Sequence, residues 1–186
     1  RQADGIILMS HRLPFDVGKG KGKLAMDNLP PIVSGCEFTG YDEIPVVAID
    51  DVQAAMDATR HLIAYGHRAI AVVTGNMNTT SSRDRLEGFR GAMSQAGLSC
   101  NEDLIVYADY TLRSGEVAAE ALLLNKNRPT AIFCFSDEIA LGCMFALRQH
   151  GFSVPDDISV MGFDNIPVAK YITPPLTTIA QPTDEI

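Results

Sequence analysis

Residues Ile158-Ser159-Val160-Met161, followed directly by Gly162-Phe163-Asp164-Asn165, decide the fold. A short, largely apolar run bounded by turn-forming residues is typical of a buried strand in a parallel sheet. We expect Gly162 to let the chain turn, which places Asp164 just beyond the strand. Ligands of open α/β sheets bind in the crevice outside the carboxyl ends of the strands. Asp164 is therefore well sited to accept hydrogen bonds from the hydroxyl or ring N–H groups of a ligand.

A second stretch, residues 174–181 with the sequence PPLTTIAQ, begins with two prolines and continues with β-branched residues. Proline favours an extended conformation in the residue before it, and β-branched residues favour strands. We expect an extended segment here that leaves one lobe of the protein for another. Together the two stretches predict a two-lobed binding protein rather than a catalyst.

The rest of the chain alternates apolar runs with segments of helical periodicity, which is the pattern of a mostly parallel sheet covered by helices. From Ile70 onward there are four strand–helix alternations, close to one complete lobe, whereas the part before Asp51 supplies only two or three strands. We therefore expect the first lobe to be incomplete. Strands are expected at residues 6–9, 32–33, 46–49, 70–73, 104–107, 131–135 and 158–161, and helices at 52–63, 86–96, 115–124 and 138–149.

Composition excludes several classes of function. The chain has 186 residues, a formal charge of −8 and an isoelectric point near 4.9, so it is a poor candidate for binding a phosphate backbone. No run approaches the roughly 18 apolar residues that a membrane span needs, and no signal peptide is visible. Because the first residue is not Met, we expect an excerpt of a longer protein. The widely spaced cysteines are expected to be reduced thiols, and the histidines lack metal-ligand spacing.

Residues 14–31 form a basic stretch that contains Gly18-Lys19-Gly20-Lys21-Gly22-Lys23. A solvated loop is the simplest interpretation, and a phosphate cradle is the alternative. A cradle would need a helix N-terminus directly behind the glycines.

Polar residues follow several of the expected strands, at what would be one edge of a parallel sheet. They include the ring of Tyr110 and the carboxylate of Asp164, with Arg85 one turn into a helix. Such a set suits a sugar or a nucleoside, because the ring stacks on a flat base or a pyranose face and the charged groups make hydrogen bonds of opposite sense. Each residue also has a structural explanation: Arg85 as a surface arginine, Tyr110 as a core-edge residue, Asp164 as a helix N-cap. The full edge comprises residues 76–82, 109–110, 136–137 and 164–165.

The sequence contains no Gly-x-Ser-x-Gly elbow, no Cys–His pair in a plausible triad order and no Gly-x-Gly-x-x-Gly fingerprint. Paired carboxylates such as Asp42-Glu43 fall in expected turns, where solvation explains them. Two specific functions remain open at this point. One is a periplasmic sugar-binding protein of the same fold, against which the unpaired cysteines count. The other is a flavodoxin-like enzyme that acts on a nucleoside.

The chain resembles the effector-binding domains of the lactose/galactose-repressor family of bacterial transcription regulators. The motifs that carry the resemblance cover nearly the whole chain; each is modest alone, and their order is specific. They are Asp4–Ile7, Val47–Asp51, His61-Leu62, Gly66–Ile70, Thr74-Gly75, Arg85–Phe89, Pro129–Phe133, Ser136–Gly142 and Val154–Val160.

The resemblance implies an α/β fold of periplasmic-binding-protein type: two doubly wound lobes with parallel sheets, joined by three crossing segments around a small effector. It divides the chain into a partial N-terminal lobe at residues 1–50, a C-terminal lobe at 51–180 and a crossover at 181–186. The family's DNA-binding headpiece and its last C-terminal elements are not expected in this chain.

The resemblance also implies which residues bind the effector. Tyr110 would stack on it, Asp164 would bind its hydroxyls, and Glu37 would reach in from the first lobe. The remaining members would supply hydrogen bonds from the cleft and the crossing strand. The full set is Glu37, Thr79, Ser81, Arg85, Tyr110, Ser136, Asp164 and Gln181. No catalytic residue, metal or cofactor is implied.

Three short stretches, Arg12–Asp16, Asn28–Pro31 and Ile179–Pro182, are most similar to the branch of the family that responds to cytidine. The expected effector is therefore a nucleoside such as cytidine, with a sugar or a purine as the alternative. The parent protein is expected to be a cytoplasmic homodimeric repressor that is not an enzyme, makes no membrane contact and binds operator DNA through the absent headpiece.

Overall fold

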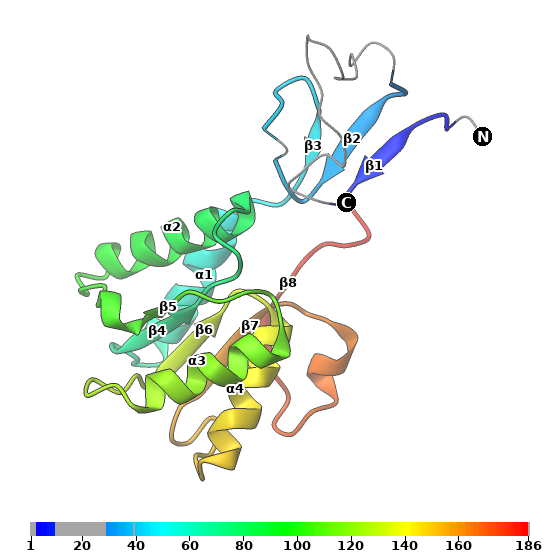
Figure 1. Cartoon of the computed structure of the whole chain (residues 1–186). Helices are drawn as coiled ribbons and strands as arrows, with labels where there is room; N and C mark the ends of the chain where they lie inside the picture. Colours follow the sequence, from blue (N-terminus) through cyan, green and yellow to red (C-terminus); the bar gives the residue numbers. More distant parts are fainter. Residues whose placement is uncertain (1–2, 10–28, 39, 186) are drawn as a thin grey trace.

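The computed structural model describes residues 3–9, 29–38 and 40–185, which form two parallel β-sheets (Figure 1). The smaller sheet has the strand order β1-β2-β3, built from β1 (Ile6–Leu8), β2 (Ile32–Gly35) and β3 (Val46–Val47). The Gly18–Lys23 stretch, the Arg12–Asp16 motif and Asn28 lie outside the described residues.

The larger sheet has the strand order β5-β4-β6-β7-β8, and every neighbouring pair in it is parallel. Its strands are β4 (Ile70–Val73), β5 (Ile105–Val106), β6 (Ala131–Cys134), β7 (Ser159–Asp164) and β8 (Thr177–Ala180). The order reverses direction between β5 and β6, as in doubly wound folds. The expected α/β class with parallel sheets is confirmed.

Helices cover both faces of the larger sheet (Figure 1). Helices α1 (Asp51–Ala64) and α2 (Thr80–Gln95) pack on the face that carries Ile70 and Val72, and α3 (Leu112–Leu123) and α4 (Asp137–Gln149) pack on the face that carries Ala71 and Val73. Both faces are buried, so the central strands read as unbroken apolar runs. Short 3₁₀ helices occupy Glu102–Leu104 and Pro167–Lys170. No helix among the described residues is long and apolar enough to span a bilayer.

Strand β7 differs from the sequence-based expectation. The turn predicted at Gly162 is wrong, because the strand continues to Asp164 and the chain turns there, with φ of 113° at Asp164 and 58° at Asn165. Gly162 serves close packing instead: a Cβ atom at this position would lie 2.2 Å from Oδ1 of Asp137. The Asp137 carboxylate accepts hydrogen bonds from the Ile166 N–H (2.7 Å) and the Thr178 hydroxyl (2.5 Å). It thereby fixes the loop that follows β7.

The two sheets are linked by residues 48–50, which lead from β3 into α1, and by the segment after β8 (Figure 1). Asp50 is the N-cap of α1 and accepts a hydrogen bond from the Gln53 N–H at 2.9 Å. Beyond β8, Gln181 and Thr183 border a cavity with Ile7 and Met9 of the smaller sheet. Both links therefore run past the carboxyl edge of the larger sheet.

Glycine sets the spacing between α3 and α4, which gives the first prediction. Gly142→Ala would place a methyl group 2.0 Å from the carbonyl oxygen of Leu112. We expect a loss of about 2 kcal/mol in unfolding free energy by urea titration, because overpacking costs more than the helix propensity that alanine adds.

The matched control is Gly91→Ala in α2, where the nearest atoms are those of Met56 at 3.9 and 4.0 Å. This variant should gain about 0.5 kcal/mol in unfolding free energy, since the site has room for a methyl group and alanine lowers the conformational entropy of the unfolded chain. Equal stability of the two variants would contradict the close contact between α3 and α4.

Candidate functional site

Arg85 lies at the centre of the carboxyl edge of the larger sheet. It is 5% exposed, so its interpretation as a surface arginine is wrong. Its Nε donates to Oδ1 of Asp51 at 2.7 Å, and its Nη1 donates to the carbonyl oxygen of Phe135. The guanidinium carbon lies 3.6 Å above the ring centre of Phe163, within the range of a cation–π contact. Arg85 thus joins α2 to α1, β6 and β7.

Asp164 ends β7 beside this guanidinium, with Oδ1 4.0 Å from Nη1 of Arg85. The alternative of a helix N-cap is wrong, because the residue belongs to the strand. Gln181 donates a hydrogen bond from Nε2 to the same carboxylate oxygen at 2.6 Å. Burial raises the pKa of Asp164 to about 6, although the Gln181 hydrogen bond and the Arg85 charge lower it. The site therefore holds a carboxylate that is costly to keep ionised.

Asp51 is a site residue that the sequence analysis missed. Asp50 caps α1, and the neighbouring Asp51 turns inward to Arg85. Burial raises the pKa of Asp51, and the charge and hydrogen bond of Arg85 oppose this rise. The signal available in the sequence was that Asp51 directly follows an expected strand. Its partner, Arg85, could be identified only from the three-dimensional structure.

Tyr110 lies over the carboxyl end of β4, where Gly75 makes room for its ring. A Cβ atom on residue 75 would sit 2.1 Å from Cζ of the tyrosine. The hydroxyl of Tyr110 lies 2.6 Å from Oγ of Ser82 and 3.3 Å from Oγ of Ser81, and shares a hydrogen bond with each. The half-buried ring packs against the apolar residues on both faces of the sheet and also borders the site, so it is both a core-edge and a site residue.

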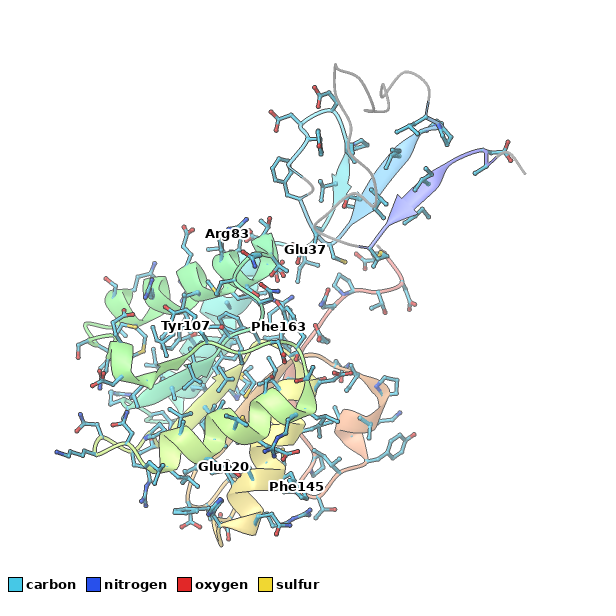
Figure 2. All side chains as sticks on the ribbon, viewed as in Figure 1. Glu37, Arg83, Tyr107, Glu120, Phe145 and Phe163 are labelled. Carbon is cyan, nitrogen blue, oxygen red and sulfur yellow. The ribbon has the colours of Figure 1, made fainter. Side chains whose placement is uncertain are left out.

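Glu37 reaches the site from the smaller sheet, immediately after the end of β2 (Figure 2). Cys36, with φ of 67°, turns the chain there. The Thr80 N–H donates to Oε2 of Glu37 at 2.8 Å, and the Ser81 hydroxyl donates to Oε1. A side chain that follows a strand of the smaller sheet therefore binds the first turn of α2, a helix that packs on the larger sheet.

Thr79 and Ser136 are buried N-caps rather than cavity-lining residues. Oγ1 of Thr79 accepts from the Ser82 N–H at 3.2 Å, and Oγ of Ser136 accepts from the Ile139 N–H at 3.2 Å. A hydroxyl at the start of a helix commonly makes this contact. The structure places both residues at the carboxyl edge but outside the cavity.

A cavity of about 120 Å³ lies between these side chains. Six of the eight residues expected to bind an effector line it, together with Cys36, Ile49 and Asp51, which sequence reasoning missed. The volume is below that of typical ligand pockets, because the lining side chains bond to one another. A ligand must exchange those bonds for its own. The lining consists of Cys36, Glu37, Ile49, Asp51, Ser81, Arg85, Tyr110, Asp164 and Gln181.

Larger cavities lie elsewhere and lack this chemistry. One of about 510 Å³ lies between α4 and residues 172–174, with Phe145 and Phe152 in its wall. Arg148 is the charged residue in that wall, and no carboxylate faces it. Among the described residues, no group of three or more His, Cys, Asp or Glu is arranged to hold a metal. The cavity around Arg85, in contrast, unites carboxylates, an amide, an aromatic ring and side chains from both sheets.

Comparison with known proteins shows the family of the chain. Residues 59–186 match the family of periplasmic binding protein-like domains. The HTH-type transcriptional repressor CytR of Escherichia coli K12 is 39% identical over 186 residues, which are 100% of this chain and 53% of CytR. The ribose operon repressor of Haemophilus influenzae is 36% identical over 188 residues, covering 100% of this chain and 54% of that repressor. The chain spans about half the length of the curated relatives it matches.

Solved structures show the same likeness. A regulatory protein of the LacI family from Chloroflexus aggregans superposes with a TM-score of 0.83 at 29% identity, covering 98% of this chain and 64% of that one. The complex of the transcriptional regulator CelR with cellobiose gives a TM-score of 0.82 at 32% identity, covering 98% and 55%.

The raised pKa of Asp164 gives a prediction about stability. In the unfolded chain the carboxyl group of Asp164 has its ordinary pKa of 3.8. The folded protein therefore binds the proton of this group more tightly than the unfolded chain does. The carboxyl group therefore favours folding below pH 3.8, and this contribution is lost as the pH rises through about 6. We expect Asp164→Asn to raise the free energy of unfolding by about 1–2 kcal/mol at pH 7.5, allowing for the partial exposure of the side chain. The increase should become progressively smaller as the pH falls toward 4.

Thermal unfolding at pH 4.5, 6 and 7.5 measures this effect, with Asp156→Asn as the control because Asp156 is exposed. A difference in midpoint that stays constant across the three pH values would show that ionisation of Asp164 does not oppose folding.

Proposed function

Because the chain belongs to the periplasmic binding protein-like family, in the group formed by the effector domains of lactose/galactose-repressor regulators, we propose that it senses a nucleoside such as cytidine in the cavity around Arg85. The observation that carries the proposal is the meeting of side chains from both sheets at one polar cavity. That cavity lies at the carboxyl edge of a parallel sheet, where such folds bind ligands.

A nucleoside fits the chemistry of the cavity. Its flat base can lie against the ring of Tyr110, and its ribose hydroxyls can donate to the carboxylate of Asp164. Gln181 now donates to that carboxylate, and its amide is able to turn toward the ligand and bond to it instead. Arg85 is already bound to Asp51 and Phe135. Its main role is therefore to orient the neighbouring Asp164 rather than to bind the ligand directly.

The cavity joins the two sheets, so ligand binding can change how they sit relative to each other. The free energy available for switching equals the difference in ligand affinity between the two arrangements. In the parent repressor, a homodimer, this change would alter how two DNA-binding headpieces meet their half-sites. On this proposal residues 1–50 belong to the N-terminal lobe, 51–180 to the C-terminal lobe and 181–186 to a crossover, and the protein acts in the cytoplasm without catalysis.

Sequence identity does not choose the effector, because CytR and the ribose operon repressor match this chain at 39% and 36%. A thermal-shift screen of the full-length protein with cytidine, uridine, adenosine, hypoxanthine, ribose and galactose decides it. A ligand at 100 times its dissociation constant should stabilise by about 2.7 kcal/mol. A shift with cytidine, uridine or adenosine supports a nucleoside effector, and a shift with ribose, galactose or hypoxanthine instead discards it. No shift with any of the six contradicts the proposed ligand class.

Asp164→Ala tests the site itself. Calorimetric titration of cytidine should show a loss of at least about 2 kcal/mol in binding free energy, because ligand hydroxyls and the Gln181 amide lose a buried acceptor. Asp156→Ala, which removes an exposed carboxylate, should bind as the unchanged protein does. Full affinity in Asp164→Ala would place the binding site elsewhere.

A further inference from the structure

The first turn of α2 is an anion-binding feature at the cavity, and Glu37 already occupies it. Free N–H groups and the helix dipole make the start of a 16-residue helix attractive to negative charge. Here the Thr80 N–H and the Ser81 hydroxyl both donate to the Glu37 carboxylate. The N–H group of Ser82 donates to Oγ1 of Thr79. An incoming anion therefore finds these donors taken.

The remaining charge around the cavity is acidic. Three carboxylates line it, those of Glu37, Asp51 and Asp164, against the single guanidinium of Arg85. Asp51 lies 2.7 Å from Arg85 and neutralises it, and a further donor of the guanidinium is bound to Phe135. The lining offers no unpaired cation within the described part of the chain.

Arg83, on the same first turn of α2 (Figure 2), is exposed and makes its hydrogen bonds outside the cavity. Its guanidinium donates to the carbonyl oxygens of Met77 (3.3 Å) and Asn78 (3.1 Å) and to Oγ1 of Thr80 (3.2 Å). It is absent from the lining. It therefore does not offset the carboxylates that face a ligand.

We propose that Glu37 is a specificity-determining residue: by occupying the start of α2, it makes the cavity select uncharged, hydroxyl-bearing ligands and reject their phosphate monoesters. The inference rests on the proposed nucleoside-sensing function and defines its ligand class. A phosphate ester carries a charge of about −2 at neutral pH, so it would face three carboxylates, while the one guanidinium of the lining is paired with Asp51 and Glu37 occupies the start of α2. Specificity then comes from repulsion as well as from attraction.

The experiment compares cytidine with cytidine 5′-monophosphate by calorimetric titration of the full-length protein at pH 8, above the pKa of Asp164. Cytidine should bind at least about 30-fold more tightly than the monophosphate, because like charges in a partly buried site repel. In Glu37→Ala, which frees the Thr80 N–H, this ratio should fall at least about 10-fold.

Two further variants separate the causes. Glu37→Gln keeps the size and the acceptor oxygen but removes the charge, so the ratio should fall in this variant too, even if the alanine variant folds poorly. Glu43→Ala removes an exposed carboxylate of the same lobe and should leave the ratio unchanged.

Each outcome decides the inference. Equal binding of cytidine and its monophosphate to the unchanged protein overturns it while the proposed function stands. A ratio that does not fall in the Glu37 variants, or that falls as much in Glu43→Ala, shows that Glu37 does not set the specificity. Failure of both ligands to bind the unchanged protein removes the nucleoside-sensing function and the inference with it.

Discussion

The buried guanidinium of Arg85 is the constraint on which the site depends. It binds a carboxylate at the start of α1, a carbonyl oxygen beyond the end of β6 and an aromatic ring of β7 at once. A charge at 5% exposure is tolerated only with such partners, because removal of one partner leaves the other buried and unpaired at a cost of about 3–5 kcal/mol. The positions of three elements at the carboxyl edge are therefore fixed together rather than one by one.

This network has a consequence for ligand binding. Because Arg85 and Asp51 satisfy each other, the groups left to respond to a ligand are those around them: Asp164 with Gln181, Tyr110 with Ser82, and Glu37 with the first turn of α2. One of these contacts joins the two sheets directly. On the proposed function, a ligand that replaces these contacts would change the bonding between the two sheets and leave the Arg85–Asp51 pair in place.

The sequence predicted much of the fold, because its apolar runs and helix periods are locally encoded. Strand β4 was found at its observed bounds, and Arg85, Tyr110 and Asp164 were grouped through the rule that parallel strands end at one edge. Gly162 misled because the same residue type permits a turn or a close contact, and only the position of Asp137 decides between them. Thr79 and Ser136 caused a similar ambiguity, since a hydroxyl at a helix start serves equally as a cap or a ligand contact. The role of Asp51 depends on a partner 34 residues away in the sequence.

The most direct test of a ligand site around Arg85 is amide hydrogen exchange in the full-length protein, with and without the effector that raises its thermal midpoint. If the effector binds where the two sheets meet, exchange should slow at Thr80–Ser82 in α2 and at residues 164–166, from the end of β7 onward, since both segments border the cavity. Protection confined to α4 and residues 172–174, around the larger apolar cavity, would contradict the account.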